Sequence, residues 1–247
     1  MTQLAKLLRV LAALGAIALV IVIADTRRIY ADNSQGNNNS QGNNNVPDNV
    51  GVLAQIGLNA ASTLLPGVQL NTAGKNLTLV GYGSYIVNVV GDCNGCHSAG
   101  PQTEYLPGHN PYFGQTPEIN PATYLGGGRN FGKVSGPPNF GPDIISRNLT
   151  PDITGKPEGG HTFAEFEQIM RTGVDLDNAH PNCPSPSPVT TTCFNPPTDG
   201  ALLQVMPWPQ FSHMTDYDLL AIYTYLSTIP CLSTGAPGTE LYNDCPQ

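Results

Sequence analysis

Apolar side chains recur with the period of an α-helix in three stretches of the chain. In the first stretch, Leu79, Tyr82, Ile86 and Val89 share one face of a helix predicted over 79–90. A face of this kind packs against a core while the opposite faces meet water. No stretch shows the strict alternation of apolar and polar residues that marks a half-buried strand. The pattern therefore predicts an all-α fold.

The other two predicted helices carry their own start signals. Thr162 is followed three residues later by Glu165, which forms a capping box ahead of an apolar stripe, and Gly173 is a natural stop. Thr215 followed by Asp218 repeats the signal before a second apolar stripe, and a later proline ends that run. We expect one helix after each cap.

Glycine and proline fill much of the remaining chain. The 27 glycines and 23 prolines are about a fifth of the 247 residues, which predicts long irregular loops between few helices. Residues 98–160 form the longest such stretch, and its length is typical of a functional loop that wraps something. Residues 46–76 have scattered apolar positions, and we expect an extended arm that lies on the domain.

The N-terminus has the features of an export segment. Lys6 and Arg9 precede an apolar run over 10–24, which fits a signal peptide and is short for a membrane span. With Leu7 and Leu8 included, the stretch approaches spanning length, so a cleaved signal and a retained anchor both stay open. Either one places the rest of the chain outside the cytoplasm, in a periplasmic or cell-exterior compartment.

A low-complexity tract follows the export segment. Residues 34–45 are two copies of Ser-Gln-Gly-Asn-Asn-Asn, which cannot bury a core and are typical of a flexible tether. The expected organisation is a signal peptide or N-terminal membrane anchor over 1–31, an Asn-rich tether and arm over 32–75, and a folded domain over 76–247.

Charge excludes one class of partner. Charged residues are 11% of the chain and the net charge is −8, which argues against nucleic acid binding. An acidic surface is compatible with docking on a basic patch of another protein.

Six cysteines divide into two sets. Four of them lie in the last third of the chain, and the local pairing of Cys183 with Cys193 and of Cys231 with Cys245 is the simplest of three possibilities. Four free buried thiols are the alternative, which an exported chain disfavours.

The remaining two cysteines belong to the string Cys93-Asn94-Gly95-Cys96-His97. This is the attachment signature of a c-type haem, in which each thiol forms a thioether and the histidine coordinates the iron. A zinc knuckle, a thioredoxin-like redox pair and a structural disulfide are the alternatives. No second C-x-x-C completes a zinc site, and no βαβ pattern surrounds the pair. The motif therefore predicts one covalent haem c.

Three methionines after the motif could supply the second axial ligand. Met170 lies on an apolar helix face and suits a core position, and Met214 just precedes the Thr215 cap. Met206 lies in a segment that two prolines stiffen, so its thioether can be held toward a metal. We expect Met206 to be the ligand. The alternative is bis-histidine ligation through one of the loop histidines, which are His109, His161, His180 and His213.

Several short strings follow the motif in a fixed order. They are YLGGG at 124–128, SRNLTPD at 146–152, FAEFEQIMRTG at 163–173, MPWP at 206–209 and MTD at 214–216. Together with the motif they span roughly residues 79–230, and their ordered combination resembles the class I cytochrome c modules of bacterial periplasmic dehydrogenases.

The resemblance implies a cytochrome c-like fold of few helices, with long Gly/Pro-rich loops around one haem. It gives Met206 the role of distal ligand, and it places Arg147, Asn148 and Trp208 near the haem propionates or edge. It also implies a dehydrogenase or an oxidase as redox partner.

A haem with both axial positions filled suits electron transfer, because no position on the iron is left for a substrate. We therefore expect an electron carrier between a periplasmic or membrane dehydrogenase and a respiratory acceptor, and not an enzyme. One alternative is a haem peroxidase or oxidase with an open or labile sixth site. Another is a surface or sensor haem protein that does not turn over electrons. Asp175 and Asp177 could suggest calcium, but the spacing lacks further ligands and favours a solvated turn.

Overall fold

A computed structural model describes residues 49–134, 141–177, 180–183, 192–235, 239 and 241–246. The predicted export segment and the Asn-rich repeats lie outside the described residues. Within the described ranges, no helix is long and apolar enough to cross a bilayer.

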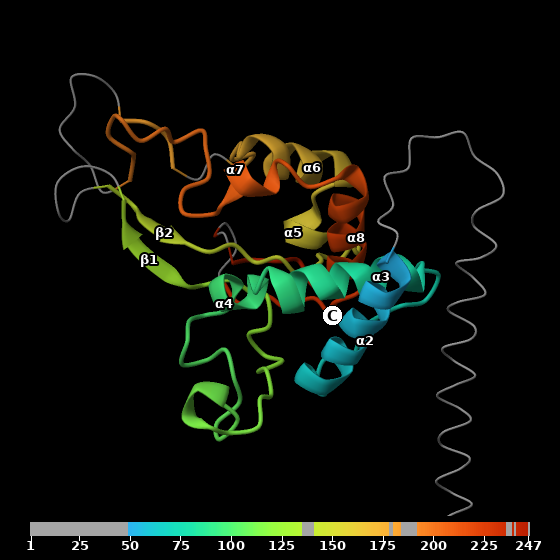
Figure 1. Ribbon diagram of the computed structural model, residues 1–247. Coiled ribbons are helices and arrows are strands. Elements are labelled where there is room, and N and C mark those ends of the chain that lie inside the picture. Colours follow the sequence, from blue (N-terminus) through green and yellow to red (C-terminus); the bar gives the residue numbers. More distant parts are fainter. Residues whose placement is uncertain are drawn as a thin grey trace, which may run out of the picture. The chain divides into compact units, whose positions relative to one another are not determined.

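The described chain is mostly helical, as the hydrophobic pattern predicts, and Figure 1 shows the arrangement of its elements. The elements in chain order are α2 (Val50–Leu64), α3 (Leu77–Ser84), η1 (Tyr85–Val90), α4 (Cys93–His97), η2 (Pro111–Phe113), β1 (Asn130–Lys133), β2 (Asp143–Ile145), α5 (Pro157–Gly160), α6 (Phe163–Thr172), α7 (Trp208–Phe211) and α8 (Asp216–Leu226).

Both predicted capping boxes are confirmed. Thr162 accepts a hydrogen bond from the Glu165 N–H while the Glu165 carboxylate accepts from the Thr162 N–H, and α6 ends at Gly173 in the left-handed region. Thr215 and Asp218 make the same reciprocal pair at the start of α8. These local signals are therefore sufficient to start each helix where the sequence places it.

The segment before the cysteine motif is helical but not uniformly so. α3 passes into the π-helical stretch η1, which ends where the Gly91 N–H donates to the Ile86 carbonyl at 2.7 Å. Asp92 then takes a left-handed conformation, with φ at 43°, and α4 begins at Cys93. π-helical turns occur preferentially at functional sites.

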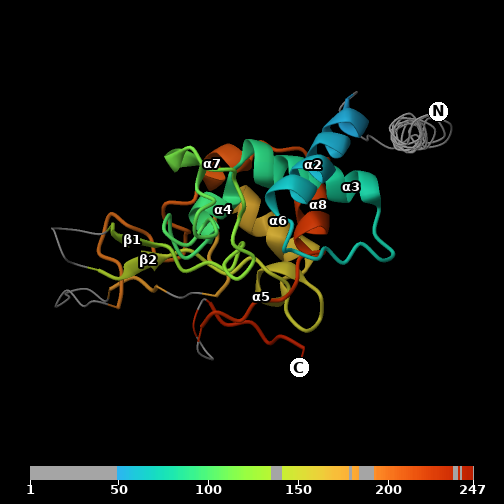
Figure 2. The same cartoon turned by 90° about the horizontal axis from the view of Figure 1, so that it is seen from below.

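Residues 50–64 differ from the expected extended arm, because they form the helix α2. Glycines explain its tight docking on α3. A Cβ atom on Gly57 would lie 2.0 Å from the Gly81 carbonyl oxygen, so the two backbones meet where neither has a side chain. In the same way, a Cβ atom on Gly83 of α3 would lie 2.0 Å from the Ala221 carbonyl oxygen on α8. Figure 2 shows α2, α3 and α8 side by side.

A short antiparallel hairpin interrupts the expected all-α fold. β1 pairs with β2 in a register that sets Asn130 opposite Ile145 and Lys133 opposite Asp143. The pairing continues toward the hairpin base, where the Gly128 N–H donates to the Ser146 carbonyl at 2.9 Å. Strands as short as these are too brief to show a detectable alternation in the sequence.

Two disulfides are as predicted, Cys183 with Cys193 and Cys231 with Cys245. The second disulfide ties the C-terminal tail to the domain, and two asparagine side chains hold the same tail through hydrogen bonds. Asn148 donates to the Leu232 carbonyl at 2.7 Å, and Asn243 donates to the Thr150 carbonyl at 2.8 Å.

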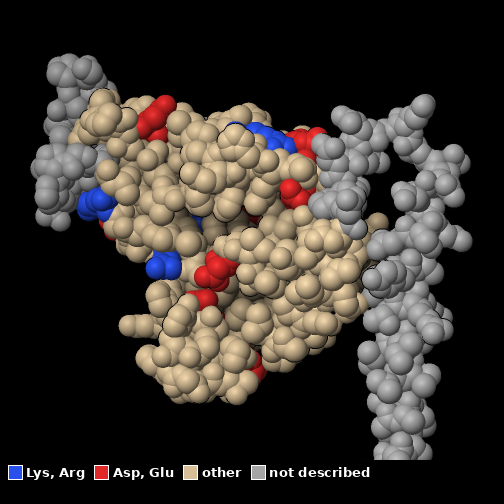
Figure 3. Space-filling view, viewed as in Figure 1, with Lys and Arg blue, Asp and Glu red and all other residues tan. Residues whose placement is uncertain are grey.

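On the face in Figure 3, charged side chains are scattered over a largely uncharged surface. This agrees with the low proportion of charged residues in the sequence.

Candidate haem site

An apolar cavity of about 1400 Å³, counting the space open to solvent at its mouth, lies beside the cysteine motif. Its walls come from η1 and α4, from the hairpin, from α6 and from α8. Lining side chains include Ile86, Val87, Phe131, Ile144, Phe166, Ile169, Met170, Leu203, Phe211, Ile222 and Leu226. In Figure 1, α6 and α7 lie across from α3, η1 and α4. A concave, mostly apolar lining with few polar groups is typical of a cofactor site.

The motif itself lies on the wall of this cavity. Cys93, Cys96 and His97 all line it, and both cysteines are free thiols. Burial, and next the negative charge of Asp92, raises the pKa of the Cys93 thiol to about 12. An activated redox cysteine has a depressed pKa, which the Cys93 thiol does not have.

His97 is held in one orientation and one tautomer. Its Nδ1 lies 2.8 Å from the Arg147 carbonyl oxygen. A carbonyl only accepts, so Nδ1 carries the proton and Nε2 keeps its lone pair. Burial lowers the pKa of His97, which keeps the ring neutral. The backbone of the same residue is fixed as well, because the Gly127 N–H donates to the His97 carbonyl at 2.8 Å.

The YLGGG and SRNLTPD strings meet at this histidine. Gly127 has φ at 72° and packs directly on Arg147, since a Cβ there would lie 2.5 Å from the Arg147 carbonyl carbon. Asn94 accepts the Leu125 N–H at 2.9 Å, which ties the motif to the same turn. YLGGG therefore positions the carbonyl that orients His97.

Met206 lies on the same cavity, on a segment with an unusual backbone. Val205 has φ at 70°, which is rare for a β-branched residue. Strain of this kind costs on the order of 1–3 kcal/mol and tends to occur at functional sites. The segment is anchored to the end of α6, because the Leu203 N–H donates to the Gly173 carbonyl at 2.7 Å.

Of the six other ligand candidates, His213 does not line the cavity, and the remaining five divide into two groups. Met170, Met214 and His180 also line the cavity, and His180 packs edge-on against Phe194. Two further histidines have polar partners of their own. His109 lies 3.3 Å from the Glu118 carboxylate, and His161 Nδ1 lies 2.7 Å from the Glu158 carbonyl.

The residues that the resemblance places near the haem propionates have other partners. The Arg147 guanidinium is bound by Asp175 at 2.6 Å and by Asp177. Asn148 does not line the cavity, because its side chain holds the C-terminal tail and accepts the Thr150 N–H. Trp208 is also outside the lining and packs on Gly173.

Asp175 is a site residue that the sequence interpretation missed. It is buried at 6% exposure against Arg147, so it does not belong to a solvated turn. In the sequence Asp175 resembles any acidic loop residue, because its partner Arg147 is far away along the chain. Glu158 was missed for the same reason, and it too lines the cavity.

These residues fit a c-type haem. Two free thiols and an imidazole with a fixed lone pair lie on one wall of a large apolar cavity, and a thioether lies on the same cavity. Thiol, imidazole and thioether are the groups that attach and coordinate haem iron in cytochromes c. A mostly helical fold with these residues is compatible with the class of covalent haem proteins.

Comparison with known proteins points the same way. The chain is 29% identical over 167 residues to the cytochrome c subunits of quinone alcohol dehydrogenase from Gluconacetobacter polyoxogenes and from Komagataeibacter europaeus. The match covers 67% of this chain and 25% of each relative. One of the subunits of nicotinate dehydrogenase from Pseudomonas putida is 29% identical over 122 residues, which is 48% of this chain and 8% of that protein.

The chain thus spans about a quarter of the length of the alcohol dehydrogenase subunits that it matches. No family model matches the chain, and no solved structure matches it significantly. The similarity is to proteins described as cytochrome c subunits of quinone alcohol dehydrogenase.

Proposed function

We propose that the chain binds one haem c through Cys93 and Cys96, with His97 as axial ligand, and that it transfers electrons. One observation carries the proposal. The Arg147 carbonyl fixes the proton of His97 on Nδ1, so that Nε2 is available in an apolar cavity that both cysteines also line.

Met206 is the proposed second ligand. Support comes from its place on the cavity and from the strained Val205 beside it, whereas Met170 belongs to the buried core at 5% exposure. A bound haem supplies a one-electron ferric–ferrous couple. The protein holds both ligands on anchored segments and surrounds the ring with apolar side chains, which exclude water and keep rearrangement on electron transfer small.

A dehydrogenase is the proposed partner, because the relatives are subunits of dehydrogenases. Export follows as a proposal from the predicted leader over 1–31, as does membrane association if that leader is retained. The tether would let the folded domain reach its partner at high local concentration. Deletion of residues 33–45 should therefore slow electron transfer to a membrane partner, and unchanged rates would contradict this role.

Haem attachment is tested by expressing the full chain in an exporting host with the maturation machinery for c-type haem. A spectrum in alkaline pyridine and the intact mass should report one covalent haem c. The double variant Cys93→Ala/Cys96→Ala should lose it. The variant Cys231→Ala/Cys245→Ala removes two cysteines outside the motif and should keep it. No covalent haem in the unmodified chain would refute the proposal.

Axial ligation is tested with Met206→Ala and the matched variant Met214→Ala. The charge-transfer band at the red edge of the oxidised spectrum should vanish in the first variant and persist in the second. Loss of low-spin character in His180→Ala alone would instead establish bis-histidine ligation. Rapid binding of carbon monoxide or cyanide by the unmodified protein would favour the enzyme alternative with an open sixth site.

A further inference from the structure

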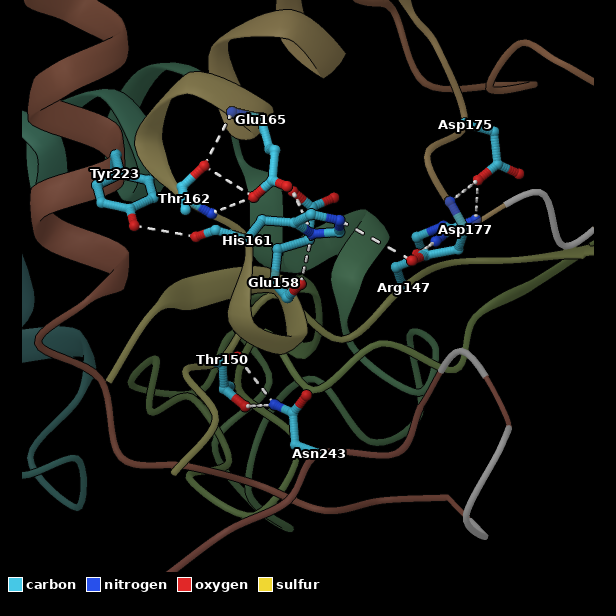
Figure 4. A network of polar contacts seen from close by, with 10 residues as sticks. All are labelled: Arg147, Thr150, Glu158, His161, Thr162, Glu165, Asp175, Asp177, Tyr223 and Asn243. Atoms are coloured by element: carbon cyan, nitrogen blue, oxygen red, sulfur yellow. Dashed lines mark hydrogen bonds and ion pairs between the residues drawn. The ribbon is translucent and has the colours of Figure 1, made fainter. Parts of the chain in front are cut away.

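A polar cluster lies on one side of the otherwise apolar cavity. Arg147, Glu158 and Asp175 line the cavity itself, while His161 and Asp177 complete the cluster behind them. Figure 4 shows these side chains facing one another from three separate segments of the chain. Electron transfer as proposed above does not require any of these ionisable side chains.

Glu158 is the member of this cluster whose position is hardest to explain. Its side chain is 9% exposed, and Oε2 is buried without a hydrogen-bond partner among the described residues. The backbone holds it there in a left-handed turn, with φ at 54° and its N–H donating to the Leu149 carbonyl at 3.2 Å. A buried carboxylate oxygen without a partner is costly, whereas a protonated carboxyl group costs much less.

The charges around Glu158 do not compensate it fully. Arg147 is the nearest permanent cation, but Asp175 and Asp177 already bind its guanidinium, so three carboxyl groups face one arginine. His161 is the other facing group. Its Nδ1 hydrogen bonds to the Glu158 backbone carbonyl and lies 3.9 Å from Oε2, which is too far for a hydrogen bond.

Burial raises the pKa of the Glu158 carboxyl. Asp175 adds to this rise, and the charges of His161 and Arg147 oppose it without reversing it. The pKa of this group therefore lies above the ordinary value for a glutamate side chain.

We propose that Glu158 takes up a proton when the haem in this cavity is reduced. The donor protein supplies one electron and converts ferric to ferrous iron, while solvent supplies one proton and converts the carboxylate to a carboxylic acid. The charge that the electron adds to the cavity disfavours a second negative charge on the same wall, so the two events assist each other. The inference rests on the proposed haem site, and it makes the chain a coupled electron and proton carrier.

The coupling predicts how the midpoint potential changes with pH. Between the pKa of Glu158 in the oxidised protein and its higher pKa in the reduced protein, the potential falls as pH rises. A tenfold change in proton activity shifts a one-electron couple by about 59 mV, which is the limiting slope per pH unit. Below the first pKa and above the second, the potential is flat.

The test is a redox titration of the haem-loaded full chain from about pH 5 to about pH 9, for the unmodified protein, Glu158→Gln and Glu104→Gln. Glu104 is a matched control, because it is buried at 8% exposure but does not line the cavity. The unmodified protein and Glu104→Gln should show the sloping region, and Glu158→Gln should be flat. Proton uptake on reduction, followed with an indicator dye in weak buffer, should approach one proton per haem and fall in Glu158→Gln.

Two outcomes would overturn the inference while the haem proposal stands. One is a potential that does not depend on pH in the unmodified protein. The other is a slope that survives in Glu158→Gln, which would assign the proton to another group such as a propionate. The variant His161→Gln tests whether the neighbouring histidine takes up the proton instead of Glu158. A sloping region that persists and moves to higher pH supports Glu158 as the proton acceptor, and loss of the slope contradicts it. A chain that attaches no haem would overturn both proposals.

Discussion

The two sides of the helix formed by α3 and η1 are packed in opposite ways. On one side, α2 and α8 approach so closely that glycine is required at the crossings, at Gly57 and Gly83. On the other side, Ile86 and Val87 face an apolar cavity of about 1400 Å³, open to solvent. On the first side, neighbouring helices fill the space next to α3. On the second side, the space next to η1 is large enough for a bound group such as the proposed haem.

The difference shows how a small helical domain can keep a large cavity. Apolar walls tend to collapse together, since burying apolar surface is favourable by about 25 cal/mol per Å². The close crossing holds α3 and α8 rigidly, while the hairpin and the two disulfides support the outer loops. Because η1 and α8 also line the cavity, their close packing against the rest of the fold helps to hold the cavity walls in place. Changes on each side should have different consequences.

Gly83→Ala should have the largest effect, because the close crossing of α3 and α8 leaves no room for a side chain at this position. The added Cβ would lie 2.0 Å from the Ala221 carbonyl oxygen, and the helices must separate to admit it. We expect a loss of roughly 3 kcal/mol in the free energy of unfolding, despite the better helix propensity of alanine. Denaturant unfolding measures this. Leu77→Ala on the same helix, at an exposed position, should change stability by less than about 0.5 kcal/mol.

Gly173→Ala should disturb the cavity side instead. Its Cβ would lie 2.2 Å from the Trp208 ring, and Trp208 follows the Met206 segment closely in the chain. We expect a loss of about 2 kcal/mol and tighter binding of added imidazole to the ferric haem, because Met206 is held less firmly. Gly155→Ala has a similar φ, 74°, with open space around it, and should leave imidazole affinity unchanged. Equal affinities in the two variants would argue against this anchoring role.

Tyr124→Phe should lower the free energy of unfolding and change how that free energy depends on alkaline pH. The Tyr124 hydroxyl lies 2.6 Å from Asn88 Oδ1 and 2.7 Å from the Tyr225 hydroxyl. Both tyrosines are buried, and Asn88 is partly buried. Removal of this hydroxyl leaves the partly buried Asn88 Oδ1 without its donor, at a cost of about 1–2 kcal/mol.

The alkaline response follows from linkage. Burial raises the pKa of Tyr124 well above its usual value, so its contribution to stability is complete below about pH 10 and falls as pH rises further. Unfolding at pH 7 and at about pH 11 should therefore show a smaller alkaline loss in Tyr124→Phe than in the unmodified protein. An equal alkaline loss would assign the effect to other tyrosines, such as Tyr225, whose pKa burial also raises.

Thr162→Ala should have the smallest effect, since it removes only one side of the α6 capping box. We expect about 1 kcal/mol of destabilisation, measured by thermal or denaturant unfolding. Thr162→Ser keeps the hydroxyl and should stay near the unmodified value. A loss far above about 1 kcal/mol would mean that the wall of the cavity depends on this helix start.

Local signals predicted the helices and missed the elements defined by distant partners. The capping pairs at Thr162 and Thr215 act over three residues, so the sequence shows them directly. The hairpin pairs very short strands across a loop, and α2 lacks a side-chain cap. Neither leaves a local pattern strong enough to detect.

The sequence by itself predicted the chemistry of the proposed site and favoured both disulfide pairings. The spacing of Cys93, Cys96 and His97 is local, and so is the loop between each disulfide pair. Only the tertiary structure decided that the Arg147 carbonyl orients His97. It also decided that Asp175 pairs with the Arg147 guanidinium and that Glu158 faces the cavity. These contacts join segments far apart in the chain, and their geometry depends on how the helices, the hairpin and the loops pack together.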